Sequence, residues 1–443
     1  MGNPLTLNST REAAKQSEAL LKVAQEAVRI QGNTGYPQAI ILSGACGSGK
    51  TYASMVLLRQ LFDIAGGGPE TDAFKHLAAA FSVLRSLGSA RTATNRDSSR
   101  LGHFIEVQVS DGALYRTKIH CYFLDQSRVV RPQATEKNYH VFYQMMAGLG
   151  AHERKELGLT GYSVRDLRYL NQGDNRVDDT VEAERFNVWK SNLAVLGIPF
   201  MDVVRVLAGI LLLGNVEFVE GNGLEVSVIG KEELKSVSSL IGVTPQLLLQ
   251  GLTSRTHRVR GQLVKSASDA NNSNATRDAL AKALYCRTVA TIVKRANSLK
   301  RPVGALSGSM SSNESVHHEV ASLHASTVGT AGSKKSSKSL AILTNAIRHA
   351  TDGFIGILDM FGFEDSKPSQ LEQLCINLCS ETMQHFYNTH TLKTSIETCR
   401  DEEIVCAVEV DYTDNAHCID LISSLVSTEC MYCRLCTSLS AHR

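Results

Sequence analysis

Apolar residues in the first part of the chain follow two different repeats. Residues 38–43 form a short continuous apolar run, which predicts a buried strand. Residues 11–29 and 51–65 carry apolar side chains at helical spacing, so each is predicted to be a helix that packs one face on a core. Glycines and a proline at residues 66–69 end the second helix. The chain is therefore expected to begin with helix, strand, glycine-rich loop and helix.

A β-hairpin and a long helical stretch are predicted next. Residues 104–109 alternate like a strand and are expected to pair with residues 114–124 across the turn Ser110-Asp111-Gly112. A polar loop, residues 92–103, leads into this hairpin. The remaining segments are predicted to be mostly helical at 138–218 and 231–252, irregular or extended at 254–264, and a long helix at 276–299.

The pattern changes again after residue 300. Residues 301–338 are rich in Ser, Gly, Ala and His and have few large apolar side chains, so they are predicted to be a disordered loop. Residues 354–358 read as a buried strand, and residues 371–393 as a helix. One face of that helix is expected to pack rather than to hold a cofactor; it carries Cys375, Cys379, Met383 and Phe386.

Composition narrows the class of protein. A hydrophobic content of 43% and a charged content of 20% are ordinary for a soluble globular chain, and a net charge of +2 gives no sign of nucleic-acid or membrane binding. The most apolar stretch, residues 203–219, contains Arg205, Asn215 and Glu217. It is predicted to be a core helix rather than a transmembrane segment. Scattered cysteines and the lack of a signal peptide favour a reduced cytoplasmic setting.

The glycine-rich loop carries the clearest chemical signal. Residues 44–51, Gly44-Ala45-Cys46-Gly47-Ser48-Gly49-Lys50-Thr51, fit the phosphate-binding pattern G-x-x-x-x-G-K-[ST], and they stand between a predicted strand and a predicted helix. Backbone N–H groups and the helix N-terminus favour an anion there. Lys50 is expected to reach the β- and γ-phosphates, and Thr51 to ligate Mg²⁺. The alternative is a glycine-rich turn that matches by chance. We call this segment the P-loop.

Two C-terminal segments carry weaker signals. Asp359 follows the predicted strand 354–358, at the sheet edge where ligands of open α/β sheets bind, although an ordinary acidic strand–loop junction would look the same. Cys430, Cys433 and Cys436 are spaced C-x-x-C-x-x-C near the end of the chain. Zinc or iron–sulfur binding is one interpretation, but no fourth ligand stands at a diagnostic spacing, and an unstructured tail is preferred.

Taken in order, several segments resemble the myosin motor domain. The P-loop resembles G-E-S-G-x-G-K-T, residues 95–100 resemble switch I (N-x-N-S-S-R), and residues 359–364 resemble switch II (D-I-x-G-F-E). We call the last two the switch I loop and the switch II loop. Further matches extend the resemblance over roughly residues 15–425. They are Leu124-Asp125-Gln126-Ser127-Arg128-Val129-Val130, Asn138-Tyr139-His140-Val141-Phe142-Tyr143-Gln144, Tyr169-Leu170-Asn171-Gln172, Leu213-Gly214-Asn215, Arg277-Asp278-Ala279-Leu280-Ala281-Lys282-Ala283-Leu284-Tyr285, Glu372-Gln373-Leu374-Cys375-Ile376-Asn377, Asp414-Asn415 and Ile419-Asp420-Leu421-Ile422.

The resemblance implies a role for each residue of the site. Ser98 would lie by the γ-phosphate and the attacking water, the Gly362 N–H would sense the γ-phosphate, and Arg100 and Glu364 would pair when the switch loops close. The implied residues are Gly44, Ala45, Cys46, Gly47, Ser48, Gly49, Lys50, Thr51 and Asn95 around ATP; Thr51, Ser99 and Asp359 around Mg²⁺; and Ser98, Arg100, Gly362 and Glu364 in catalysis.

It also implies a fold and an organisation. We expect an α/β P-loop NTPase core with a mostly parallel central sheet and a large helical subdomain. The expected divisions are a core with the P-loop and switch I loop (1–130), a largely helical upper actin-cleft subdomain (131–300), a disordered insertion (301–338), the switch II strand and relay helix (339–425), and an unstructured tail (426–443).

The sequence also departs from the family pattern. Asp97 stands where the family has Asn, and a carboxylate about 5 Å from a phosphate oxygen costs roughly 3 kcal/mol at an effective dielectric near 20. His103 replaces a Lys, and Ala45 and Cys46 replace Glu and Ser. The family's N-terminal subdomain and its adenine-contacting loop, N-P-x-x-x-x-x-Y, have no counterpart before the P-loop, and the family pattern would continue beyond Ile422. A fragment of a divergent unconventional myosin is therefore expected.

Two functions from different classes follow. The first is a cytoplasmic, cytoskeleton-associated motor that couples ATP hydrolysis to actin filament binding, with light chains or calmodulin bound only in a longer parent protein. The alternative is a pseudo-motor, a nucleotide-sensing or actin-tethering scaffold with little turnover, which Asp97 would favour. A GTPase or small-molecule kinase is less consistent, because the chain has no N-K-x-D guanine signature and the match extends far past the P-loop.

Overall fold

The computed structural model describes residues 18–65, 68, 70–110, 113–221, 226–259, 262–298, 353–365, 367, 369–405 and 412–427. The predicted disordered insertion, the Cys430–Cys436 cluster and residues 1–17 lie outside these ranges. Among the described residues, no helix combines the length and the apolar character that crossing a membrane requires.

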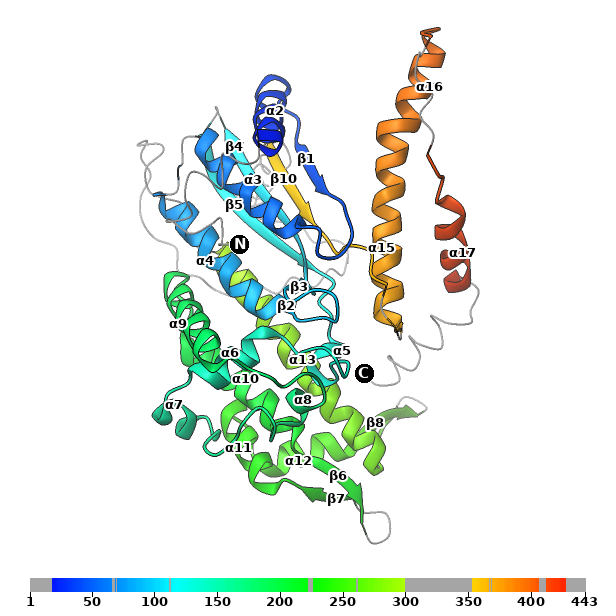
Figure 1. Cartoon of the computed structure of the whole chain (residues 1–443). Coiled ribbons are helices and arrows are strands. Elements are labelled where there is room, and N and C mark those ends of the chain that lie inside the picture. Colours follow the sequence, from blue (N-terminus) through cyan, green and yellow to red (C-terminus); the bar gives the residue numbers. More distant parts are fainter. Residues whose placement is uncertain are drawn as a thin grey trace, which may run out of the picture.

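A four-stranded sheet organises the upper part of the molecule (Figure 1). Its strands lie in the order β1 (Gln38–Leu42), β10 (Phe354–Asp359), β4 (Gly102–Ser110) and β5 (Ala113–Tyr122). The expectation of a mostly parallel sheet was wrong for the described strands. Only β1 and β10 pair in parallel, while β10–β4 and β4–β5 are antiparallel. The short turn that joins β4 to β5 leaves them no other arrangement.

The helices next to the sheet confirm the predicted order of elements. Helix α2 (Glu18–Thr34) precedes β1, and α3 (Lys50–Ile64) follows the P-loop and buries most of its apolar residues. Thr71 caps the N-terminus of helix α4 (Asp72–Gly88), because its hydroxyl accepts a hydrogen bond from the Phe74 N–H. The helix ends at the two-residue strand β2 (Ser89–Ala90), which pairs with β3 (Ser98–Ser99) and so fixes the switch I loop.

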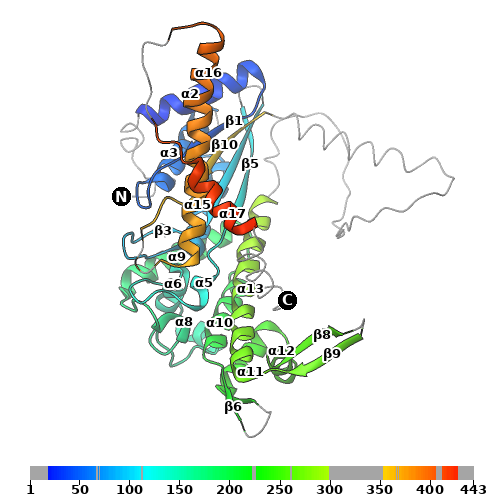
Figure 2. The ribbon, with the colours of Figure 1, turned by 90° about the vertical axis from the view of Figure 1, so that its right-hand side faces the viewer.

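A helical subdomain lies below the sheet (Figures 1 and 2). Its longest member, α13 (Ala270–Asn297), reaches from β5 down through the subdomain, and α10 (Phe200–Gly214) is the predicted core helix. The expected extended region is an exposed hairpin, β8 (Ser254–Val259) and β9 (Gln262–Ala267). The other elements are α5 (Ser127–Val130), α6 (His140–Gly148), α7 (Ala151–Glu156), α8 (Arg168–Asn171), α9 (Asp179–Val195), β6 (Glu217–Glu220), β7 (Val226–Ile229), α11 (Lys231–Ile241) and α12 (Pro245–Thr253).

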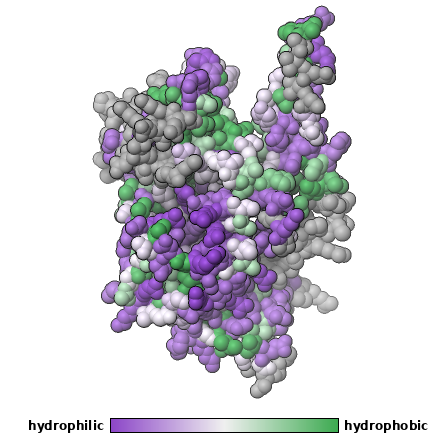
Figure 3. Space-filling model, viewed as in Figure 1, coloured by the Kyte–Doolittle hydropathy of each residue, from purple (hydrophilic) through white to green (hydrophobic). Residues whose placement is uncertain are grey.

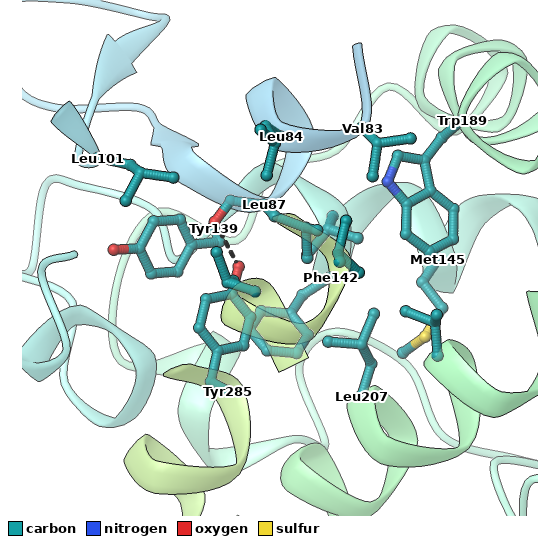
Figure 4. Packing of buried hydrophobic residues seen from close by; sticks show 14 of the residues in the cluster. Val83, Leu84, Leu87, Leu101, Tyr139, Phe142, Met145, Trp189, Leu207 and Tyr285 are labelled. Atoms are coloured by element: carbon teal, nitrogen blue, oxygen red, sulfur yellow. Dashed lines mark hydrogen bonds between the residues drawn. The ribbon is translucent and has the colours of Figure 1, made fainter. Parts of the chain in front are cut away.

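The core of this subdomain is aromatic and closely packed (Figure 4). Tyr285 of α13 stacks on Tyr139 with ring centroids 4.9 Å apart, and Phe142 lies 5.5 Å from Tyr285. The Tyr285 hydroxyl donates a hydrogen bond to the Leu87 carbonyl at 2.7 Å. Trp189 stacks on Phe186. The core is therefore continuous with the end of α4, which carries the switch I loop.

The helix predicted at residues 371–393 forms an arm beside the sheet (Figure 1). It consists of α15 (Leu371–Tyr387), a π-helical turn η1 (Asn388–Lys393) and α16 (Thr394–Asp401), and α17 (Ala416–Ser427) packs along α15. The predicted packing face is covered only in part: Cys379 and Met383 are half-buried, whereas Cys375 is exposed and Phe386 is 46% exposed. The residues of α15 that are fully buried are Gln373 and Ile376. Figure 3 shows hydrophobic atoms at the surface at the tip of this arm.

Candidate functional site

The P-loop connects β1 to α3. Gly49, directly before α3, has a φ of 95°, in the left-handed region that favours glycine. The Lys50 ammonium donates hydrogen bonds to the Gly44 and Ala45 carbonyls, both at 2.8 Å. Burial lowers the pKa of Lys50, while the nearby Asp359 carboxylate acts in the opposite direction. The P-loop thus places the N-terminus of α3 and the Lys50 side chain at the same cavity.

The switch I loop touches the P-loop through two pairs of side chains. The Cys46 thiol lies 3.2 Å from the Ser98 hydroxyl, and the Thr51 hydroxyl lies 3.1 Å from the Ser99 hydroxyl. Asn95 is close as well, with its amide nitrogen 3.8 Å from the Cys46 sulfur. These contacts join segments that the sequence analysis could relate only through the resemblance.

The end of β10 completes an oxygen-rich cluster. Asp359 is 3% exposed, and one of its carboxylate oxygens has no hydrogen-bond partner within the described residues. Burial raises the pKa of Asp359 to about 6, although a hydrogen bond with Thr51 and the charge of Lys50 lower it. Two hydroxyls and one carboxylate are the kind of donors that Mg²⁺ accepts. The unsatisfied carboxylate oxygen fits such a cation, because an unpaired buried charge is costly.

The switch II loop packs backbone against backbone on the P-loop. The Cys46 N–H donates to the Phe363 carbonyl at 3.1 Å. A Cβ added at Gly362 would collide with the Gly44 carbonyl and with Ala45. Only glycine fits at this position without displacing the P-loop backbone.

Arg100 and Glu364 form a buried ion pair between the two switch loops. Their side chains are 1% and 7% exposed, and the Arg100 Nη1 donates to Glu364 Oε2 at 3.1 Å. Arg100 also donates to the Ser98 hydroxyl. Burial lowers the pKa of Arg100, but the hydrogen bond and charge of Glu364 outweigh this effect and raise it overall. The predicted pairing of these residues is present in the structure.

Together the three loops line a cavity of about 260 Å³. It is slightly smaller than typical small-molecule pockets and suits the phosphate end of a nucleotide. Six of its lining residues were not predicted from the sequence to belong to the site. They come from α3, α4, β2 and the start of the switch II loop, and they are Tyr52, Met55, Arg85, Ser89, Met360 and Phe361.

Asp97 faces two partners that the sequence analysis did not foresee. Its carboxylate lies 3.1 Å from the His140 imidazole and 3.4 Å from the Arg85 guanidinium. The contact with His140 is the main cause that holds the pKa of Asp97 well below its usual range, and Arg85 adds to it. The carboxylate is therefore ionised and compensated within the protein, although it borders the cavity.

Comparisons with known proteins agree with this arrangement. The family model for the myosin head (motor domain) matches residues 9–304 and 339–431. The chain is 30% identical to Myosin-8 of Arabidopsis thaliana over 93% of this chain and 26% of that protein. It is 31% identical to the Myosin-I heavy chain of Dictyostelium discoideum over 88% of this chain and 15% of that protein.

A further relative is unconventional myosin-Vb of Mus musculus, which is 30% identical over 91% of this chain and 20% of its own length. The chain thus spans about a quarter or less of each of these three relatives. The family match covers the P-loop, both switch loops, the helical subdomain and α15. This chain belongs to the myosin head (motor domain) family.

Proposed function

We propose that this motor domain binds ATP with Mg²⁺ and couples its hydrolysis to actin filament binding and movement. One observation carries the proposal: Lys50, Ser99 and Gly362 come from three segments far apart in the sequence, yet all line one cavity. A glycine-rich turn that matched by chance would have no reason to meet the other two loops.

The phosphate end of the nucleotide would lie on the P-loop. Lys50 now bonds to two neutral carbonyls. Phosphate oxygens offer it charge-assisted hydrogen bonds, which are roughly twice as strong as neutral ones. The N-terminus of α3 and the glycine backbone add further donors. Asn95, which lies near the Cys46 sulfur at the edge of the cavity, would contact the same phosphates.

Thr51, Ser99 and Asp359 would hold Mg²⁺. When bound, the cation supplies positive charge beside the β- and γ-phosphate oxygens. The protein's own part is to fix the three donors, and the hydrogen bond between Thr51 and Asp359 already does so for two of them. This assignment explains why a carboxylate with an unpaired oxygen is buried at the end of β10.

Ser98, Arg100, Gly362 and Glu364 would carry the hydrolytic step. Ser98 is held between Cys46 and Arg100, where its hydroxyl can orient an attacking water. The Gly362 N–H would bind the γ-phosphate. The buried Arg100–Glu364 pair holds the two switch loops together. Phosphoryl transfer needs mainly such positioning and charge stabilisation from the protein.

Hydrogen bonds link the switch II loop to α15 and supply a route for movement. Asn377 of α15 accepts from the Glu364 N–H at 2.8 Å and donates to the Glu364 carbonyl at 2.9 Å. The Ser380 hydroxyl donates to the Phe361 carbonyl at 3.2 Å. A shift of the switch II loop on loss of the γ-phosphate would therefore displace α15.

The β8–β9 hairpin is our candidate for part of the filament contact. It projects from the helical subdomain, away from the sheet (Figure 2). Arg258 and Lys265 are exposed on it, Leu263 is 75% exposed, and residues 254–267 contain no acidic side chain. An exposed basic and apolar surface of this kind suits an acidic partner. Association with the actin cytoskeleton in the cytoplasm is part of the same proposal.

A titration with a fluorescent ATP analogue tests the nucleotide role. Lys50→Ala should weaken binding at least about 100-fold, since it removes a charge-assisted bond in a partly buried site. Equal affinity of the Lys50→Ala variant and the unmodified chain for the ATP analogue would contradict the proposed nucleotide binding. Actin-activated phosphate release separates a motor from the pseudo-motor, which predicts none. The contacts of Asp97 weaken its support for the pseudo-motor, because the Arg85 guanidinium lies 3.4 Å from its carboxylate and the His140 imidazole lies 3.1 Å from it.

A further inference from the structure

His103 is a buried histidine for which the catalytic scheme has no use. It lies on β4, is 6% exposed, and packs against Phe81 with ring centroids 5.9 Å apart. Neither ring nitrogen has a hydrogen-bond partner within the described residues. Burial lowers the pKa of His103 to about 4, so the ring is neutral near pH 7 and carries one donor and one acceptor nitrogen. A buried polar group without partners requires an explanation.

Its position points to the metal site. In the antiparallel pairing of β4 with β10, His103 lies directly opposite Asp359. Directly opposite residues place their side chains on the same face of a sheet. His103 also lines a small cavity of about 20 Å³ with Thr51, Ser99 and Ser89. That volume is enough for one water molecule.

The hydroxyl protons of the metal site need acceptors. Thr51 and Ser99 lie 3.1 Å apart, and either hydroxyl can donate to the other. When a cation ligates both oxygens, a proton between them would face the cation and be repelled. Each proton must then point to another acceptor. Thr51 has the Asp359 carboxylate. Within the described residues no second acceptor is seen for the Ser99 hydroxyl, and His103 lines the same cavity and offers one.

We propose that His103 is a positioning residue for the cation site. Its acceptor nitrogen takes the hydrogen bond of the Ser99 hydroxyl, directly or through one water in the small cavity, and leaves the Ser99 oxygen free to ligate Mg²⁺. This inference rests on the proposed function, because it requires that Thr51, Ser99 and Asp359 hold the cation. It adds a residue that no phosphate-binding motif contains.

A matched pair of variants tests it. His103→Phe keeps a ring against Phe81 but removes the acceptor, whereas His103→Gln keeps an acceptor. The measurement is the Mg²⁺ concentration that half-saturates Mg²⁺-dependent binding of a fluorescent ATP analogue, with affinity in excess EDTA as the reference. His103→Phe should raise the half-saturating concentration 10–100-fold, the usual effect of losing an outer partner of a metal ligand. His103→Gln should stay within about threefold of the unmodified chain, and neither variant should change the affinity in EDTA.

The possible failures are distinct. An unmodified chain whose nucleotide binding does not depend on Mg²⁺ would overturn the proposed function and this inference with it. Mg²⁺-dependent binding with an unchanged midpoint in His103→Phe, or equal shifts in both variants, would overturn the role of His103 alone. If His103→Phe does not fold, ¹⁵N spectra of the histidine-labelled protein decide. Ser99→Ala should move the signal of the His103 acceptor nitrogen, and an unmoved signal overturns the proposal.

Discussion

The nucleotide pocket and the core of the helical subdomain are held together by different forces. The pocket joins its loops through polar contacts, such as the Arg100–Glu364 pair and the Thr51–Ser99 hydroxyls. The subdomain core is built from apolar and aromatic side chains, and Trp189 and Phe142 are almost fully buried there (Figure 4). Directional polar bonds that can be exchanged join the loops of the pocket. Apolar surface that must stay buried holds the core of the helical subdomain together.

This difference separates function from stability. Polar contacts between loops can open when a ligand offers better partners, so the pocket is suited to change shape. Close-packed apolar cores do not deform gradually, so the subdomain moves as a body. Substitutions in the pocket should therefore alter ligand binding or a specific pairing, and substitutions in the core should alter the free energy of unfolding alone.

The largest effect on stability is expected from Trp189→Ala. The Trp189 side chain is 1% exposed and stacks on Phe186. Its loss leaves a cavity in the core beside α9 and should lower the free energy of unfolding by about 3–5 kcal/mol. Denaturant unfolding measures this change. Val188→Ala on the same helix is the matched control, because Val188 is 59% exposed and should cost no more than about 0.5 kcal/mol. Similar losses in both variants would contradict the comparison.

Arg100→Met should destabilise the chain by about 3 kcal/mol for a different reason. It leaves the Glu364 carboxylate buried without its partner. The double variant Arg100→Met with Glu364→Met should recover most of that loss, since replacing a buried pair by apolar residues is often close to neutral. Hydrolysis would remain impaired in both. If the double variant is as unstable as Arg100→Met, the pair contributes more to stability than the neutralisation of each charge by the other.

The sequence allowed prediction of features that depend on neighbouring residues. The P-loop, its strand and helix, and the β4–β5 hairpin follow from contiguous patterns, because adjacent residues decide the local backbone. The direction of β10 against β4 could not be derived, since it depends on how distant segments are threaded. The exposed face of α15 escaped prediction too: an apolar repeat indicates a helix but not which side a neighbour covers.

The site shows the same limit at single residues. Asp97 looked like an uncompensated charge because the sequence does not show which cations face it. The two groups that face it come from α4 and α6, and only the packing of these helices brings Arg85 and His140 to it. His103 likewise gave no chemical signal in the sequence. Its environment became visible only when the strand register placed it opposite Asp359.

Tyr285→Phe tests a contact that joins the two regions. It keeps the stack on Tyr139 but removes the hydrogen bond to the Leu87 carbonyl at the end of α4 (Figure 4). The free energy of unfolding should fall by about 1–1.5 kcal/mol, with nucleotide affinity unchanged within about twofold. Tyr122→Phe, at a 44% exposed position, is the control. A large loss of affinity in Tyr285→Phe would mean that the core positions the switch I loop directly.

The smallest effect is expected from Asp97→Asn. Its half-exposed pairs with Arg85 and His140 should contribute no more than about 1 kcal/mol to stability. An uncompensated carboxylate beside the phosphates would make the Asn variant bind ATP on the order of 100-fold more tightly, from about 3 kcal/mol of repulsion. Because both partners already oppose that charge, we expect less than about a threefold gain in a nucleotide titration.

His140→Phe should then weaken binding in the Asp97 chain but not in the Asp97→Asn chain, since only the former has a charge to release. Equal effects of His140→Phe in both backgrounds would show that His140 acts on the pocket without Asp97.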